Sequence, residues 1–169
     1  VYKDGILSFL DQTKLPLQVI YEEQQTCEQI YDSIKMLKVR GAPAIGIAGA
    51  YGLVVSVKKY INEPVDKFLI ELKNTGEYLN SSRPTAVNLS WAVNRIIKKA
   101  ENCSCNSSNE LWLELEKEAE NIYNEDKEIC ANIGKYGAEL IYDNFGVLTH
   151  CNAGALAVSE LGTALAPVY

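Results

Sequence analysis

The segment from Ala42 to Val57 constrains the fold of this chain more than any other stretch. It is almost entirely apolar, yet it falls short of the roughly 20 residues of a membrane span and carries Gly46, Gly49 and Gly52 at every third position. Small residues at that spacing leave one face of a helix bare, so that a neighbouring backbone can pack closely against it. Pro43 suits the start of a helix because its missing N–H costs nothing there. The sequence therefore predicts a buried, closely packed helix.

Helical patterns also fill most of the chain up to residue 144. Thr26 and Gln29 form a capping-box pattern, so a helix should begin there and end near Val39. The polar Asn, Ser and Cys residues over 102–109 predict a loop. Further helices are expected from an Asp66 cap, over Thr85–Lys99 and over Glu110–Tyr142, and strands in a hairpin around Asp4-Gly5 and over Leu15–Tyr21.

The texture of the sequence changes only after Asn144 and Gly146, which end the last long helix. Val147–Cys151 has the pattern of a short strand, and Gly154 then leads into a helix of small residues. One strand and one helix cannot bury enough surface to form a domain. We therefore expect a first unit over residues 1–144 and the start of a second over 145–169, which continues beyond Tyr169 or is completed by another chain.

Composition and charge exclude several classes of function. With 47% hydrophobic and 22% charged residues, the chain resembles a soluble globular protein. Its net charge of −6, without a run of Lys and Arg, argues against a nucleic-acid partner, although a local Arg and helix N-termini can still bind an anionic small molecule. We see no membrane span and no secretory signal, and expect no membrane partner and a cytoplasmic location. Its five cysteines are expected to be free thiols.

Two segments repeat one device for holding an anion. Arg40 and Gly41 precede the helix that Pro43 opens, and Arg83 precedes Pro84 and a second helix. A helix N-terminus offers unpaired N–H groups and the positive end of its dipole, and Arg adds a bidentate fork for phosphate oxygens. Each segment alone is also compatible with an ordinary helix start and a solvated Arg. Two such devices in one small unit favour a shared phosphate site.

A third candidate site surrounds Cys151. If Val147–Cys151 is a buried parallel strand, Cys151 lies at its carboxyl end before a Gly turn, where α/β sheets place their ligands, and near a helix N-terminus that favours thiolate. The alternative is a buried core cysteine. His150 points to the other face of such a strand and has a structural role in this interpretation. Cys103 and Cys105 lack the second pair that a zinc site needs, so no metal is expected.

Four segments, read together, carry a resemblance. They are Leu10–Pro16 (LDQTKLP), Val39–Gly46 (VRGAPAIG), Ser82–Leu89 (SRPTAVNL) and Thr149–Ala157 (THCNAGALA). In this order and spacing, the chain resembles the 5-methylthioribose-1-phosphate isomerase family over essentially its whole length. The wider superfamily also contains ribose-1,5-bisphosphate isomerases and regulatory subunits of the eukaryotic translation initiation exchange factor. The proline of Arg-Gly-Ala-Pro-Ala favours the methylthioribose enzyme.

The resemblance implies a fold and a set of site residues. It implies a mainly α N-terminal domain with a small β element, followed by the first strand and helix of a truncated Rossmann-like α/β domain. Arg40, Gly41 and Ala42 match one substrate-binding segment of the family, Arg83 matches a second, and Cys151 matches the catalytic cysteine. The family's catalytic aspartate and a following Asn-Lys segment lie downstream and match no position here. Val158 replaces a threonine that is frequent in the family.

The implied reaction converts 5-methylthioribose 1-phosphate to its ketose, 5-methylthioribulose 1-phosphate, in methionine salvage, without a metal or organic cofactor. The complete enzyme would be a homodimer that contains the missing C-terminal half. A general acid assists ring opening, and a hydrogen then moves from C2 to C1. Two alternatives stay open: a non-catalytic regulatory subunit of the superfamily, and a ribose-1,5-bisphosphate isomerase.

Overall fold

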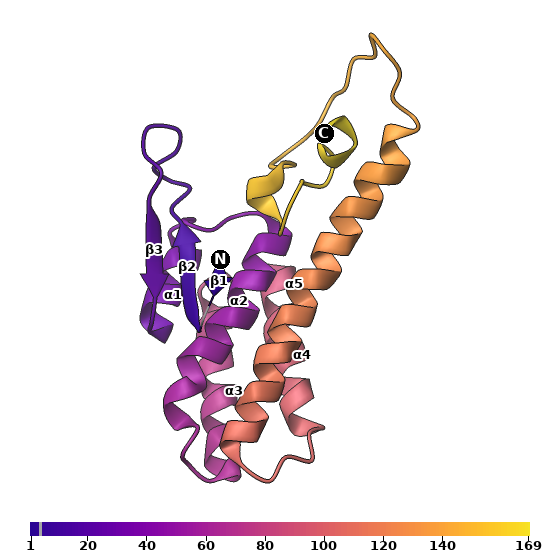
Figure 1. Ribbon diagram of the computed structural model, residues 1–169. Coiled ribbons are helices and arrows are strands. Elements are labelled where there is room, and N and C mark those ends of the chain that lie inside the picture. Colours follow the sequence, from indigo (N-terminus) through magenta and orange to yellow (C-terminus); the bar gives the residue numbers. More distant parts are fainter. Residues whose placement is uncertain (4) are drawn as a thin grey trace.

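The computed structural model describes residues 1–3 and 5–169 (Figure 1). Helix α2 (Ala42–Val57) packs against the other four α-helices and forms the centre of the molecule. A three-stranded sheet lies on one side, and the C-terminal segment folds back beside the end of the longest helix (Figure 1). No helix within the described part of the chain is both long and apolar enough to cross a membrane.

The glycine face of α2 confirms the prediction of a closely packed buried helix. A Cβ on Gly46 would lie 3.0 Å from the carbonyl oxygen of Asn88, and one on Gly49 would lie 2.5 Å from Leu89 Cδ1. On Gly52 it would lie 2.6 Å from Ile30 Cγ2. Contacts this short exclude a larger side chain without a shift of the neighbours. The glycines therefore set how closely α2 meets its partner helices.

The sheet is antiparallel, with β2 (Ile6–Leu10) between β1 (Tyr2–Lys3) and β3 (Tyr21–Gln24). The predicted hairpin joins β1 to β2; of its two turn residues, Asp4 lies outside the described residues. The predicted strand over 15–21 is wrong, because the third strand begins only at Tyr21. Pro16 has no N–H for a strand ladder, and Leu17, at 91% exposed, has no face to bury.

Helix α1 (Cys27–Lys35) begins at the predicted capping box. Thr26 Oγ1 accepts from the Gln29 N–H, and the Gln29 side chain accepts from the Thr26 N–H. The helix ends before the predicted Val39, because Leu37 adopts a φ of 60° and turns the chain away from the helical path. Residues 38–41 then connect α1 to α2 in a bent, irregular path.

Three further helices complete the bundle, each with boundaries slightly different from those predicted. Pro64, not Asp66, occupies the N-cap of the next helix, and Asp66 lies in its first turn. Ser107 caps the longest helix, so that it begins earlier than Glu110, and it ends before Tyr142. These helices are α3 (Val65–Ser81), α4 (Val87–Glu101) and α5 (Ser108–Ala138).

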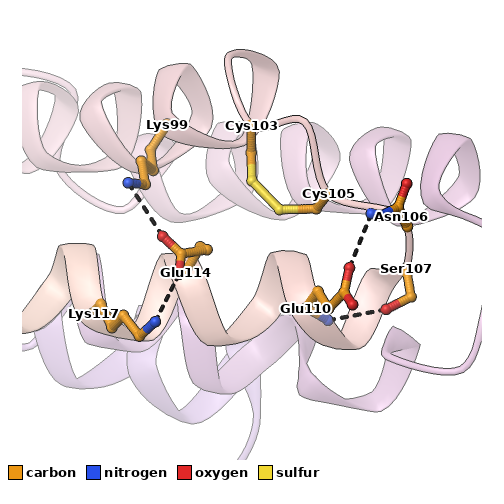
Figure 2. Close-up of a disulfide and its surroundings, with 8 residues drawn as sticks. All are labelled: Lys99, Cys103, Cys105, Asn106, Ser107, Glu110, Glu114 and Lys117. Atoms are coloured by element: carbon orange, nitrogen blue, oxygen red, sulfur yellow. Dashed lines mark hydrogen bonds and ion pairs between the residues drawn. A yellow bond between two sulfur atoms is a disulfide. The ribbon is translucent and has the colours of Figure 1, made fainter.

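The short loop between α4 and α5 contains a disulfide between Cys103 and Cys105 (Figure 2). The prediction of five free thiols is therefore wrong for this pair, whereas Cys27, Cys130 and Cys151 are free. The tight connection brings the Cα atoms of the pair to 5.4 Å, which is within the range for a disulfide.

The C-terminal segment differs most from the expectation. Residues 145–151, all of them described, form no strand, and a single 3₁₀ turn, η2 (Ala155–Ala157), stands where an α-helix was expected. A parallel strand needs neighbours to pair its backbone groups, and the described part of the chain places no strand beside this stretch. The segment docks on α5 instead, where the Ser159 N–H donates to Asp126 Oδ2 at 2.8 Å and the 3₁₀ turn η3 (Ala166–Val168) covers Gly134 and Gly137.

Candidate functional site

The N-termini of α2 and α4 lie at the same end of the bundle. Gly46, early in α2, meets Asn88 at the start of α4, and Gly49 meets Leu89 and then Val93 one turn further on. Contacts that advance together along both sequences mean that the two helices run parallel. Their dipoles therefore present two positive ends and two sets of unpaired N–H groups in one region.

Each of these helix N-termini is preceded by one of the arginines predicted from sequence. Arg40 is exposed and stands two residues before α2, and Arg83 is half-buried and stands four residues before α4. Ser82 holds the second approach in place, since its buried Oγ donates to the Leu79 carbonyl at 2.6 Å. Within residues 1–3 and 5–169, no carboxylate lies within 4.0 Å of either guanidinium. Both positive charges are therefore available to an anion.

Gly41 joins the first arginine segment to the C-terminal segment. It is the N-cap of α2, with a φ of 102°, and a Cβ there would lie 2.4 Å from the Ala157 Cα. Gly41 therefore meets two requirements: it adopts a positive φ, and it leaves room for the backbone of Ala157. Ala42 begins the helix directly after it. Ala157, which Gly41 meets, lies six residues downstream of Cys151 in the sequence.

Gln12 belongs to the candidate site by its contacts, although no sequence pattern around it predicted this. Its buried side chain accepts from Arg40 Nε at 3.4 Å and donates to the Leu156 carbonyl at 2.8 Å. It therefore connects the first arginine to the C-terminal segment. The signal for it was present in the LDQTKLP segment, but only as part of the resemblance, because a lone Gln after a strand predicts no particular role.

Cys151 is exposed and adopts a φ of 63°, so it is not the buried strand residue that the pattern suggested. Among the described residues, no hydrogen bond links it to Arg40 or Arg83. His150 is exposed as well. Burial raises the pKa of the other two free thiols, Cys27 and Cys130, and Asp126 raises that of Cys130 further. Of the free cysteines, Cys151 is the one that solvent or a ligand reaches readily.

A cavity of about 410 Å³ adjoins this region, between the sheet, α2 and the C-terminal segment. Gln12, Ala44 and Leu156 line it where it borders the arginine segment, and Phe9 and Tyr51 contribute to its apolar wall. Neither Lys nor Arg occurs among the described residues of its lining. In residues 1–3 and 5–169, no three His, Cys, Asp or Glu side chains converge as a metal site would require. The arrangement suits a small ligand with an anionic group and an apolar end.

The amino-acid sequence of this chain is similar to those of several known proteins. Residues 38–167 match the Initiation factor 2 subunit family. The 5-deoxyribose 1-phosphate isomerase of Bacillus anthracis is 47% identical over 168 residues, which are 99% of this chain and 48% of that protein. The protein of the same name from Clostridium botulinum (strain Hall) is 48% identical over 163 residues, 96% of this chain and 47% of that protein. The chain thus spans about half the length of these relatives.

Two solved structures share the fold. The 5-methylthioribose 1-phosphate isomerase of Pyrococcus horikoshii OT3 superposes with a TM-score of 0.92 at 38% identity, over 99% of this chain and 47% of that one. The translation initiation factor eIF-2B subunit delta from A. fulgidus superposes with a TM-score of 0.89 at 42% identity, over 99% and 48% of the two chains. The fold of this chain therefore corresponds to about half of each of these two solved chains.

Proposed function

The chain belongs to the Initiation factor 2 subunit family, and from that premise we propose that it forms the N-terminal part of an aldose–ketose isomerase. The substrate we propose is 5-methylthioribose 1-phosphate and the product 5-methylthioribulose 1-phosphate, a step of methionine salvage. The complete protein would be a cytoplasmic homodimer whose second half continues residues 145–169 as a Rossmann-like domain. Support comes from the names of its relatives, which include sugar-phosphate isomerases.

The observation that carries this proposal is the pair of parallel helix N-termini, each preceded by an arginine with no carboxylate beside it in the described structure. A phosphate needs several N–H donors and positive charge, and helix N-termini with Arg forks supply both. Arg40, Gly41, Ala42 and Arg83 are the proposed substrate-binding residues. A phosphate held at two points also fixes the sugar for reaction, which contributes a large part of catalysis.

Cys151 is the proposed catalytic residue of this chain. Isomerisation requires that a hydrogen leave C2 of the opened sugar and reach C1, and a thiol can act there as a base or stabilise the transition state. Cys151 lies in the exposed stretch that leads into η2, which itself covers Gly41. The acid that opens the ring would come from the second half of the complete protein.

The cavity beside the arginine segment supports an apolar group at C5 of the sugar. The names 5-methylthioribose and 5-deoxyribose both describe sugars without a free hydroxyl at C5. The cavity wall contains Phe9, Tyr51 and Leu156, and its described lining includes no Lys or Arg side chain. A second phosphate, as in ribose 1,5-bisphosphate, would find no Arg fork or Lys side chain there to offset the cost of burying its charge. This favours the methylthio or deoxy sugar.

One observation favours a second candidate function. The match to the eIF-2B subunit delta structure, at a TM-score of 0.89, shows that the same fold occurs in a protein named as a translation factor. A regulatory subunit would need the fold and its surfaces but not Cys151. The two candidates therefore differ in whether the thiol and the arginines affect turnover.

A chimera tests the proposal. Residues 1–169 are fused to the part of the Bacillus anthracis relative that lies outside its 168-residue match to this chain. We expect turnover of 5-methylthioribose 1-phosphate and 5-deoxyribose 1-phosphate, and little of ribose 1,5-bisphosphate. Cys151→Ser should lower kcat by about 10²-fold or more, whereas Cys130→Ser should affect stability more than rate. A folded chimera that is inactive on all three sugars contradicts the isomerase and favours the regulatory subunit, whereas an active chimera that Cys151→Ser leaves unchanged contradicts the catalytic role of Cys151.

A further inference from the structure

We infer that Gln12 is a positioning residue that fixes the guanidinium of Arg40 for its anionic ligand and ties it to the C-terminal segment. This inference rests on the proposed phosphate site, and it adds Gln12 to the residues of that site. Gln12 is 7% exposed, so its amide must find partners within the protein. Both ends of the amide do so, and the two partners belong to different parts of the site.

The oxygen end faces Arg40. Gln12 Oε1 accepts from Arg40 Nε at 3.4 Å. A bond to Nε restrains the plane of the guanidinium while leaving the two Nη groups, which form the fork that meets phosphate oxygens. An exposed arginine without such a bond samples many rotamers, and a ligand must then order it at an entropic cost. Gln12 lowers that cost before the ligand arrives.

The nitrogen end faces the C-terminal segment. Gln12 Nε2 donates to the Leu156 carbonyl at 2.8 Å, and the next residue, Ala157, is the one that packs on Gly41. One side chain therefore bonds both the arginine before α2 and the segment that follows Cys151. Loosening either contact changes the distance between the two parts of the proposed site.

The backbone holds Gln12 at this place. Its N–H donates to the Lys38 carbonyl at 2.9 Å, two residues before Arg40. Asp11, on the other side, donates to the Ile20 carbonyl at 2.9 Å and accepts from the Thr13 N–H and hydroxyl at 2.9 and 2.6 Å. A glutamine on so fixed a turn has few alternative positions, which is the property that a positioning residue needs.

The test reads Arg40 directly. In the 169-residue chain with ¹⁵N-labelled arginine, the Nε–Hε signal of Arg40 is identified by its absence in Arg40→Lys. We expect this hydrogen to exchange slowly with water in the unmodified chain and, in Gln12→Ala, to exchange at the rate of a solvated arginine. Gln12→Glu keeps an acceptor for Arg40 and should keep the slow exchange, which provides an answer if Gln12→Ala does not fold. The matched control is Gln24→Ala, a glutamine 3% exposed that bonds Ser33 instead.

Titration with inorganic phosphate separates this inference from the proposed function. Gln12→Ala should weaken phosphate binding on the order of tenfold, the effect of one charge-assisted bond, and Gln24→Ala should not. If phosphate binds and the Arg40 signal is the same in Gln12→Ala, the inference is overturned and the phosphate site stands. If the Arg40 signal depends on Gln12 and phosphate does not bind, Gln12 positions Arg40 as inferred and the phosphate site of the proposed function is contradicted.

Discussion

Gly41 is the residue at which two distant parts of the chain come closest. Its φ of 102° strains any residue with a Cβ, and that Cβ would also lie 2.4 Å from the Ala157 Cα and 2.7 Å from its carbonyl oxygen. The obstacle is backbone, which cannot rotate away as a flexible side chain would. Local conformation and long-range packing therefore both demand glycine at the position that begins α2.

Gly41→Ala should destabilise the chain by about 2–4 kcal/mol, from left-handed strain and overpacking together. The free energy of unfolding, measured in urea, reports it. Gly146→Ala is the matched control, because a Cβ there meets nothing within 4 Å, and its effect should stay within about 0.5 kcal/mol. Equal effects of the two substitutions would show that Ala157 does not rest on Gly41.

The cysteines allow a second test at the level of single residues. Without reduction, the unfolded chain should titrate as three thiols, and after reduction as five, because Cys103 and Cys105 are paired. Among the three, Cys151 should react first with iodoacetamide in the folded chain, since it is exposed while burial raises the pKa of Cys27 and Cys130. Peptide mass mapping at short times identifies the site. First labelling at Cys130 would contradict the burial described here.

At the scale of elements, Arg95 links the two antiparallel helices α4 and α5. Its Nε donates to Glu118 at 2.6 Å, its Nη2 donates to Glu125 at 2.7 Å, and the guanidinium lies over the Trp91 ring. Glu118 is only 13% exposed, so its carboxylate depends on this partner. Arg95 in turn lowers the pKa of Glu125.

Arg95→Met should cost about 1–3 kcal/mol, because it leaves the half-buried Glu118 carboxylate unpaired. Lys67→Met is the control, since the Lys67–Glu63 pair is exposed on both sides and such pairs contribute about 0–1 kcal/mol. The folded-state pKa of Glu125 lies below its unfolded value, so its contribution exists above about pH 4.3 and is lost as pH falls further. The difference between wild type and Arg95→Met should therefore shrink from pH 7 to pH 3. A constant difference would assign it to packing on Trp91.

Local signals predicted the elements that they control. The capping box at Thr26 and the apolar, glycine-spaced stretch from Ala42 are satisfied by contacts within or next to each helix, and both helices form as expected. The strand over 147–151 depended on neighbours that the sequence up to Tyr169 does not supply, and it does not form here. The end of α1 was missed because the φ of 60° at Leu37 is a conformation that leucine rarely adopts, so its identity gave no warning.

At the scale of the whole molecule, the candidate site lies at one end of the bundle, where distant segments meet. The sequence predicted Arg40 and Arg83 because each precedes a recognisable helix start. It could not predict that α2 and α4 run parallel, because that is a property of packing. Nor could it predict that Gln12 joins Arg40 to Leu156, because Gln12 and Leu156 are 144 residues apart in the sequence.

The last prediction separates binding from chemistry in the isolated chain. The chain spans about half the length of its relatives, and the proposed ring-opening acid lies in the other half. A missing general acid alone costs about 10²–10⁴-fold in rate.

The purified chain should therefore bind inorganic phosphate at its arginines but turn over 5-methylthioribose 1-phosphate at less than about one hundredth of the rate of the chimera. Phosphate protection of Arg40 from phenylglyoxal measures binding, and appearance of the ketose measures turnover. Turnover by the isolated chain close to that of the chimera would mean that residues 1–169 hold the whole catalytic apparatus, and the proposed division of labour between the two halves would be wrong.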